Sequence, residues 1–249
     1  MIILPNYRVS DIRKLFAEMF LKKDFTQNKN KTGSLTIEII GATFIADEDS
    51  IFGEINENWI KRESEWYHSQ SKNVNDIPGG APQIWKMVAS DKGFINSNYG
   101  NLIFSEENFN QFNNCLTQLE LDEHSRRATM IYTRPSIQYD YCVDGMSDFI
   151  CTETVQYFIR DEKLITVVKM RSNDAWAGFR NDLAWQKEVQ SLLYDKLLKT
   201  YPQLLLGPII WSVGSLHLYE KQFYLVDNFT KTGNIHISKD NWLLSNSGD

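Results

Sequence analysis

Cysteine is scarce in this sequence. The 249 residues include three cysteines, Cys115, Cys142 and Cys151, and no two of them have C-x-x-C spacing. An odd number of widely spaced cysteines argues against a disulfide framework and against a cysteine-based metal site. We therefore expect no bound metal and a reducing compartment, the cytoplasm, which would be the host cytoplasm if the source is viral.

Long apolar runs and an excess of positive charge are also lacking. No apolar stretch reaches the roughly 18–20 residues of a membrane-spanning helix, and residues 1–5 lack the basic segment that begins a signal peptide. The chain has 26 Lys and Arg against 32 Asp and Glu, a net charge of −6. We expect no membrane partner and no direct nucleic-acid binding, for which a basic surface is typical.

Repeats, low-complexity tracts and Pro/Gly-rich linkers are absent from the sequence. The chain is therefore predicted to form a single domain over residues 1–249. Its hydrophobic fraction of 42% is ordinary for a globular protein. A chain of this length buries roughly 70–75% of the surface that it exposes when unfolded, so its core needs no disulfide or metal for stability.

Hydrophobic periodicity predicts helices and strands in mixed order. Helices are expected at residues 10–22, 58–69, 106–119, 183–200 and 217–231, with Ser10 capping the first. Strands are expected at residues 34–44, 128–132, 149–159, 164–170 and 204–213, with a loop at 79–80 and a tight turn at 161–163. Because the two kinds of element do not alternate strictly, the pattern favours an α+β fold over a doubly wound sheet.

Cys151 and Arg171 are the first candidates for chemistry. Arg171 opens a stretch, residues 171–174, that combines a phosphate-binding cation with a hydroxyl and a carboxylate, and residues 178–182 follow closely. The two strands predicted at 149–159 and 164–170 form a hairpin, which can bring Arg171 back toward Cys151. A guanidinium beside a thiol favours the reactive thiolate. The alternative is a buried, inert side chain, which is the commoner role of a single cysteine.

Further cations could complete a phosphate site. Arg126 and Arg127 are adjacent, and Lys31 precedes Thr32 and Gly33. An adjacent arginine pair is often only a solvated turn, but arginine also suits bidentate recognition of phosphate. The Lys31 segment lacks the glycine–lysine spacing of a Walker loop, so it does not predict a nucleotide triphosphate site.

Glu63 and several aromatic or imidazole side chains are candidates for acid–base chemistry or binding. Glu63 lies in a predicted helix among apolar residues, where it is either a surface acid or a general acid/base with a pKa raised by burial. Tyr99, His217 and Tyr219 are either binding groups or core side chains with a satisfied hydrogen bond. No histidine has metal-ligand spacing.

Ten segments of the chain carry a family resemblance. They are residues 36–42, 63–67, 97–100, 125–127, 130–136, 144–149, 155–157, 171–174, 178–182 and 213–219. In this order they resemble the thymidylate synthase superfamily nearly end to end, and more closely the bacteriophage deoxycytidylate (dCMP) hydroxymethylases within it. One segment alone would be moderate support, but ten in the family's order make a chance resemblance implausible.

The resemblance implies a fold, an assembly and a reaction centre. The fold would be of thymidylate synthase type, α+β, with a large mixed or antiparallel sheet flanked by helices. Two copies would form a homodimer through the faces of their sheets. Cys151 would be the nucleophile, and Glu63, with Tyr99 beside it, would organise the waters that move protons.

The resemblance also implies a set of binding residues. The ligands would be dCMP and the co-substrate 5,10-methylenetetrahydrofolate, with no metal. Lys31 is the weakest assignment, because the synthases have an arginine there. The residues are Arg171 and Ser172 for phosphate, Arg126 and Arg127 for the phosphate of the neighbouring subunit, Lys31 as a further cation, His217 and Tyr219 for the sugar 3′-hydroxyl, and Asp174 and Trp85 for the folate.

Two departures from the synthase pattern bear on the substrate. The synthases follow their nucleophile with histidine, where this chain has Thr152, and recognise uracil through an asparagine, where this chain has Asp182. An amide can donate to the uracil 4-oxygen, whereas a carboxylate accepts from the cytosine amino group and from a protonated nitrogen 3. A mismatched base would leave buried polar groups without partners, at a cost of about 1–3 kcal/mol per group.

The expected reaction is hydroxymethylation of dCMP through a covalent Cys151 adduct, with Asp182 stabilising the protonated ring. The alternatives are a dCMP methylase, which would deliver hydride in place of water, and a hydroxymethylase of the ribonucleotide CMP. A further alternative, from outside the enzymes, is a catalytically idle subunit that binds nucleotide within a nucleotide-synthesis complex.

Overall fold

The computed structural model describes residues 4–27 and 34–245. The chain divides into two compact units. Unit 1 comprises residues 1–55, 172–184 and 210–249, and unit 2 comprises residues 56–171 and 185–209. Three elements pass from one unit to the other: strand β5 (Lys163–Asp174), helix α7 (Ala177–Leu197) and strand β6 (Leu205–Tyr219). The two units are therefore interleaved in the sequence.

Six strands form one sheet in the order β1-β2-β6-β5-β4-β3. Neighbouring strands pair antiparallel at β1/β2, β2/β6, β3/β4 and β4/β5. β5 and β6 instead run in the same direction: Gly207 lies against Leu164 near the two strand starts, and Ala175 donates to the His217 carbonyl near their ends. The sheet is mixed, and the α+β prediction is confirmed. The remaining strands are β1 (Thr26–Gln27), β2 (Leu35–Ile45), β3 (Thr129–Ile131) and β4 (Thr152–Arg160).

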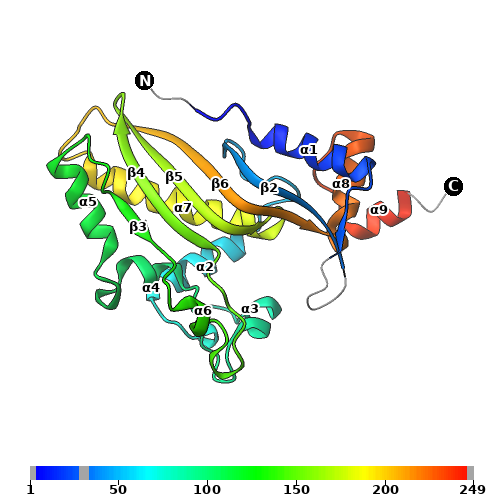
Figure 1. Ribbon diagram of the computed structural model, residues 1–249, viewed down its shortest axis with the longest axis horizontal. Helices are drawn as coiled ribbons and strands as arrows, with labels where there is room; N and C mark the ends of the chain where they lie inside the picture. The colour runs from blue at the N-terminus through cyan, green and yellow to red at the C-terminus, as the bar shows by residue number, and fades with distance from the viewer. Residues whose placement is uncertain (1–3, 28–33, 246–249) are drawn as a thin grey trace. The chain divides into compact units, whose positions relative to one another are not determined.

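Unit 1 is built on the β2/β6 ladder, which runs from Thr36 opposite Tyr219 to Ile45 opposite Ile210. Phe179 of α7 packs between Phe44 of β2 and Trp211 of β6, with ring centroids 5.7 and 5.4 Å apart, and all three rings are fully buried. Figure 1 shows α1 and α8 side by side in this unit. The helices of unit 1 besides α7 are α1 (Val9–Leu21), α8 (Phe223–Thr232) and α9 (Lys239–Ser245), with a 3₁₀ turn at Glu220–Gln222.

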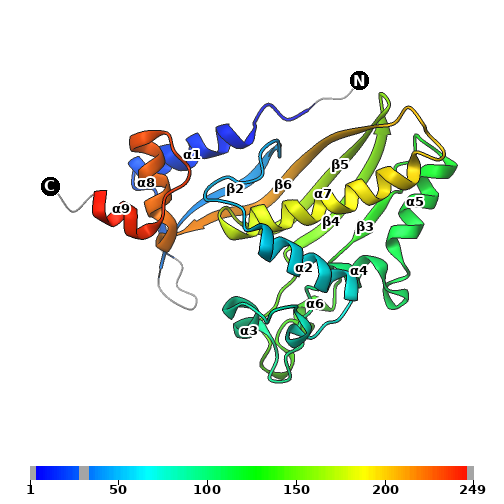
Figure 2. The same cartoon turned by 180° about the vertical axis from the view of Figure 1, so that it is seen from behind.

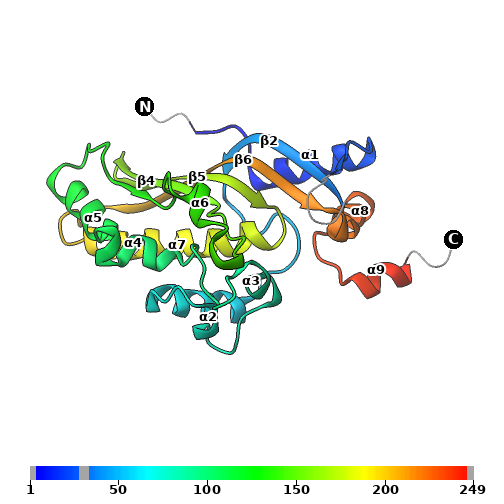
Figure 3. The ribbon, with the colours of Figure 1, turned by 60° about the horizontal axis from the view of Figure 1, so that its bottom comes forward.

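Unit 2 contains the hairpin of β4 and β5 and a layer of helices. Asp161 and Glu162 form its two-residue turn with φ of 50° and 57°, the left-handed pair that suits the twist of a hairpin. α4 lies beside α2 (Figure 2) and against α5 (Figure 3). The helices are α2 (Glu57–Ser69), α3 (Gln83–Val88), α4 (Tyr99–Phe104), α5 (Gln111–Leu121) and α6 (Ile137–Asp140), with 3₁₀ turns at Val74–Asp76, Glu106–Asn108 and Val143–Gly145.

Gly100 explains how closely α2 and α4 approach. A Cβ at this position would lie 1.8 Å from the Tyr67 carbonyl oxygen of α2, which no side chain can satisfy without moving the backbone. The absence of a side chain therefore lets the start of α4 meet the last turns of α2. This contact sets where Tyr99 stands relative to α2.

Most predicted elements are confirmed within a few residues, but three expectations are wrong. Residues 217–219 are not helical, because they continue β6 and pair with β2, and α8 begins at Phe223. The helix predicted at 106–119 is split by left-handed residues Phe109 and Asn110. Ser10 does not cap α1, which begins at Val9, where Asp11 accepts the Arg8 N–H.

Membrane insertion through a helix finds no support in the part of the chain that the structure describes: none of its helices combines the length and apolar character needed to span a bilayer.

Candidate functional site

Cys151 stands immediately before β4, opposite Arg171 on β5. The Arg171 N–H donates to the Cys151 carbonyl at 2.8 Å, and the Arg171 Nη2 atom lies 3.7 Å from the Cys151 sulfur. The same Nη2 donates to the Phe149 carbonyl at 3.2 Å, and the guanidinium lies over the Phe149 ring, 4.7 Å from its centroid. The hairpin thus brings the cation to the thiol, as its turn and strand lengths predicted. The Cys151 side chain is half-buried.

Asp148 fixes the backbone that leads into Cys151. Its side chain is buried, and its two carboxylate oxygens accept from Asn96 N–H at 2.7 Å, Ser97 N–H at 2.8 Å and Ser97 Oγ at 2.8 Å. Burial raises the pKa of Asp148, although these hydrogen bonds and Arg134 act in the opposite direction. The segment before Cys151 is in this way tied to the segment before Tyr99.

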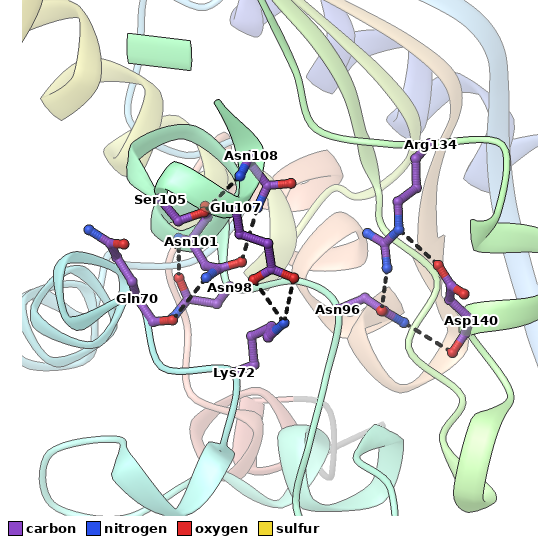
Figure 4. Close-up of polar contacts among 10 residues, drawn as sticks. All are labelled: Gln70, Lys72, Asn96, Asn98, Asn101, Ser105, Glu107, Asn108, Arg134 and Asp140. Carbon is purple, nitrogen blue, oxygen red and sulfur yellow. Dashed lines mark hydrogen bonds and ion pairs between the residues drawn. The ribbon is translucent and has the colours of Figure 1, made fainter. Parts of the chain in front are cut away.

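Asn96 extends this linkage to a second loop. Its amide oxygen accepts from Arg134 Nη2 at 2.8 Å, and its amide nitrogen donates to the Asp140 carbonyl at 3.3 Å and the Asp148 carbonyl at 3.1 Å. Arg134 also donates to the Asp140 carboxylate at 2.8 Å. Figure 4 shows Arg134, Asp140 and Asn96 pointing toward one another. A separate contact in the same view joins Lys72 to Glu107 at 3.2 Å.

Glu63 and Tyr99 lie on the packed pair α2 and α4. Glu63 is only 7% exposed, and Tyr67 follows it by one helical turn. The Tyr99 ring stacks on Tyr67 with centroids 5.4 Å apart and an interplanar angle of 24°. Glu63 is therefore a buried acid. Burial is what the general acid/base interpretation of Glu63 requires, whereas the alternative was a surface acid. Trp85, half-buried on α3, packs edge-on against Trp66 of α2 at 5.5 Å.

Arg126 and Arg127 are exposed in the connection between α5 and β3. Their backbones are held, since the Arg126 carbonyl accepts from Gln156 at 2.9 Å and the Arg127 N–H donates to Ser125 at 3.2 Å. Across residues 4–27 and 34–245, no protein acceptor is bonded to either guanidinium. The two cations therefore project from a fixed backbone.

Asp182, on α7, is the central residue of the candidate site in unit 1. The Asn173 amide nitrogen donates to its Oδ2 atom at 2.7 Å, and Trp211 donates to the Asn173 amide oxygen at 3.3 Å. Desolvation by burial raises the pKa of Asp182 to about 7, the nearby Asp174 adds to the increase, and the Asn173 hydrogen bond opposes it. Near neutral pH this carboxyl is populated in both protonation states.

Asp174 begins the turn into α7. Its Oδ1 accepts the Trp176 N–H at 3.2 Å, and its Oδ2 accepts the Ala177 N–H at 2.9 Å and the Gly178 N–H at 3.4 Å. A carboxylate in this place stabilises the start of a helix, because it satisfies backbone donors that have no helical partner. Asp174 thus orients the helix that carries Asp182, whatever else it binds.

His217 and Tyr219 occupy the same face of β6, two residues apart. Their rings meet edge to face with centroids 4.9 Å apart, and both side chains are half-buried. Their pairing follows from the strand, which the sequence pattern did not predict at this point. Ser172, next to Arg171 on β5, is also half-buried, and Lys31 lies outside the described residues.

Three residues that hold candidate side chains were missed by the sequence interpretation: Asn173 and Trp211 in unit 1, and Asp148 in unit 2. Asn173 lies within the stretch singled out for its chemistry, and strand alternation puts its side chain on the face opposite those of Ser172 and Asp174. That alternation was the available signal for a buried amide. Nothing in the sequence pairs Trp211 with Asn173, because 38 residues separate them.

No group of three or more His, Cys, Asp and Glu side chains that could hold a metal ion occurs among residues 4–27 and 34–245.

Comparisons with known proteins agree on one family. The profile of the family described as "Thymidylate synthase" matches residues 15–237. The chain is 54% identical over 243 residues to the deoxycytidylate 5-hydroxymethyltransferase of Enterobacteria phage T4, covering 97% of this chain and 98% of that protein. It is 54% identical over 242 residues to the protein of the same name from phage T6, covering 96% and 98%.

The fold is similar to that of a solved structure, thermostable thymidylate synthase A from Bacillus subtilis. The TM-score is 0.66 at 19% sequence identity, over 90% of this chain and 84% of that one. At this identity the likeness establishes the fold.

Proposed function

Because the chain belongs to the thymidylate synthase family, we propose that it transfers a one-carbon unit from 5,10-methylenetetrahydrofolate to carbon 5 of dCMP. Water completes the transfer, so the products are 5-hydroxymethyl-dCMP and tetrahydrofolate. The two phage relatives are deoxycytidylate 5-hydroxymethyltransferases by name and match the chain nearly end to end, which supports this substrate and this product.

The Asp182 carboxyl is the observation that carries the choice of base. It is a desolvated acid with a pKa raised to about 7, and Asn173 holds one of its oxygens. Cytosine offers an amino donor and a basic ring nitrogen side by side, and a carboxyl group can accept from the first while sharing a proton with the second. Uracil has an oxygen acceptor in place of the amino group, so the Asp182 carboxylate would place its oxygen against the lone pairs of the uracil 4-oxygen.

Cys151 acts as the nucleophile on carbon 6 of the cytosine. The Arg171 guanidinium, 3.7 Å from its sulfur, stabilises the thiolate electrostatically. Addition moves the ring π electrons toward nitrogen 3, where Asp182 stabilises the protonated ring, and carbon 5 becomes nucleophilic. Carbon 5 attacks the one-carbon unit and then loses its proton as tetrahydrofolate leaves, which gives an exocyclic methylene. Water adds to this methylene, and Cys151 departs. Glu63, buried beside the Tyr67–Tyr99 stack, exchanges protons with the reacting water.

Binding of the nucleotide is assigned to residues on β5 and β6. Arg171 and Ser172 hold the phosphate, and His217 and Tyr219, paired on one face of β6, bond the sugar 3′-hydroxyl. Lys31 is proposed as a further cation. In a homodimer formed through the sheet faces, Arg126 and Arg127 reach the neighbouring subunit's phosphate. Their exposed guanidinium groups on an ordered backbone support that role.

The folate would lie against Trp85 and Asp174. Trp85 leaves part of its ring surface accessible beside Trp66, which fits a planar pterin. Asp174 already accepts backbone donors with both oxygens, so a folate contact would use their remaining lone pairs. When bound, the folate supplies carbon at the oxidation level of formaldehyde. The phage source of the relatives supports a site of action in the cytoplasm of an infected cell.

The test is tritium release from [5-³H]dCMP together with the mass of the product. Tritium release that depends on methylenetetrahydrofolate and a product heavier by one CH₂O unit are expected. A product heavier by CH₂, formed with dihydrofolate, would make the protein a methylase. Preference for CMP over dCMP would show that the substrate carries ribose and not deoxyribose. Binding of dCMP without tritium release would indicate a nucleotide-binding subunit without catalytic activity.

A further inference from the structure

Asn173 links Asp182 to the core of unit 1. Its side chain is 3% exposed, on β5, and it joins Asp182 on α7 at 2.7 Å to Trp211 on β6 at 3.3 Å. Trp211 is itself fully buried. The three side chains form a chain of hydrogen bonds that starts in the core and ends at the carboxyl group.

The direction of this chain is set by chemistry. An indole N–H can only donate, so the amide oxygen of Asn173 must face Trp211. The amide nitrogen, which can only donate, then faces Asp182 and makes Oδ2 an acceptor. A flipped amide would place N–H against N–H at Trp211 and oxygen against oxygen at Asp182, and would lose both bonds.

One consequence concerns the proton on Asp182. Because Oδ2 accepts from Asn173, the proton of the neutral acid is carried by Oδ1, the other oxygen. Within the described part of the chain, no protein donor is bonded to Oδ1. The two oxygens therefore have different roles: one is held by the protein and the other is available to exchange a proton.

We propose that Asn173 is a positioning residue that directs the exchangeable proton of Asp182 onto Oδ1, the oxygen presented to nitrogen 3 of cytosine. This inference rests on the proposed function and deepens it. As the bond from Cys151 sulfur to carbon 6 forms, the C5=C6 π pair moves to C4–C5 and the C4=N3 π pair moves to N3. N3 takes the proton from Oδ1, leaving a neutral adduct and a carboxylate that Asn173 still holds. When Cys151 departs, the proton returns to Oδ1.

Gly178 provides the space for this arrangement. A Cβ on Gly178 would lie 3.1 Å from the Asn173 amide nitrogen and 3.8 Å from Asp182 Oδ2. The absence of a side chain on α7 one turn before Asp182 leaves room for the amide beside the carboxyl. In unit 1, the negative charge of Asp174 raises the pKa of Asp182. Asp174 also interacts electrostatically with Arg180, which lies on α7 with Asp182.

The test compares Asn173→Leu with a matched control. Leucine has the same number and branching of side-chain heavy atoms as asparagine but cannot donate a hydrogen bond, so the pKa of Asp182 should rise above its value of about 7. The basic limb of kcat/KM for dCMP should move to higher pH by at least half a pH unit. Loss of the fixed orientation should lower kcat by roughly tenfold to a hundredfold. Trp211→Phe, which removes only the donor to the amide, should shift the limb less in the same direction.

Gln190→Leu is the control. Gln190 is another buried amide, 5% exposed, but it donates to the backbone carbonyls of Leu164 and Gly207. Its loss should lower the thermal midpoint and leave the basic limb in place. An unmoved limb in Asn173→Leu, or an equal movement in Gln190→Leu, would overturn the proposal.

A second measurement does not depend on turnover. The Asp182 carboxyl can be titrated by ¹³C NMR in the wild type, with Asp182→Asn identifying its signal. If Asn173→Leu does not fold, Asn173→Ser, whose hydroxyl can still donate, should titrate between the wild type and the value expected for burial alone. A wild type that releases no tritium would end the proposed function, while an Asp182 titration unaffected by Asn173 substitutions would end this inference alone.

Discussion

The Arg171 guanidinium lies 3.7 Å from the Cys151 sulfur while it donates to the Phe149 carbonyl two residues earlier. The cation is thus anchored on the same short segment that carries the thiol. A hairpin whose strands leave a two-residue turn at Asp161 and Glu162 produces this arrangement.

Arg171→Leu should therefore slow the alkylation of Cys151 by iodoacetamide at neutral pH, because the neighbouring positive charge favours the thiolate. The experiment uses a Cys142→Ser background, since Cys142 is exposed. Cys115 should not interfere, because burial raises the pKa of its thiol to about 12. We expect a decrease of at least severalfold, measured by mass spectrometry of the modified peptide. An unchanged rate would mean that the guanidinium does not activate this thiol.

Cys151→Ser should abolish turnover and leave dCMP binding intact, because a hydroxyl is a far weaker nucleophile at neutral pH. Tritium release and calorimetric titration with dCMP measure the two properties separately. Cys142→Ser is the control and should keep full activity, because Cys142 is exposed and, within the part of the chain that the structure describes, the hydrogen bond of its thiol goes to the Tyr139 carbonyl. Turnover by Cys151→Ser would exclude the covalent adduct.

Asp182→Asn should shift the preference from dCMP toward dUMP. An amide at position 182 can donate to the uracil 4-oxygen and can still accept from Asn173, so the polar groups around uracil keep their hydrogen bonds. The expected change in the ratio of kcat/KM values is at least tenfold, since each mismatched buried group costs about 1–3 kcal/mol. Competition between the two nucleotides in one reaction measures it. An unaltered preference for dCMP would remove Asp182 from base recognition.

The same residue should make stability depend on pH. Burial raises the pKa of Asp182 from 3.8 to about 7, so between these values the folded protein binds more protons than the unfolded chain. Its stability must then fall as pH rises through this window. Relative to Asp182→Asn, the wild type should lose about 2–3 kcal/mol of unfolding free energy between pH 5 and pH 8. Urea denaturation of both proteins at the two pH values measures the difference, and parallel stability curves would contradict it.

Arg127→Ala subunits mixed with Cys151→Ser subunits should regain activity if each site borrows a cation from its neighbour. One of the two sites in such a heterodimer then has both an intact thiol and an intact arginine. Activity close to a quarter of the wild-type value is expected for random mixing, because half the dimers are mixed and each has one complete site. Native mass spectrometry confirms the heterodimer, and heterodimers without activity would show that Arg127 acts within its own subunit.

Much of this protein could be predicted from its sequence because the relevant interactions are local or periodic. The α2 and α7 helices follow from their apolar spacing, and the β4/β5 hairpin follows from alternation around Asp161 and Glu162. Cys151 and Arg171 could be paired because the hairpin register is set by its turn. The start of the helix predicted at 217–231 was wrong, because residues 217–219 pair with residues 36–38 of β2, about 180 residues away in the chain, and this pairing overrode the local pattern.

The sequence by itself determined the fold class and the presence of a carboxylate at position 182, and it predicted Cys151 as the nucleophile. Only the tertiary structure decided that this carboxylate is desolvated and that Asn173 holds one of its oxygens. The physical reason is that an amide has no preferred direction of its own. Trp211, on another strand, gives it one through a single indole N–H, and such a partner is found only when the chain has folded.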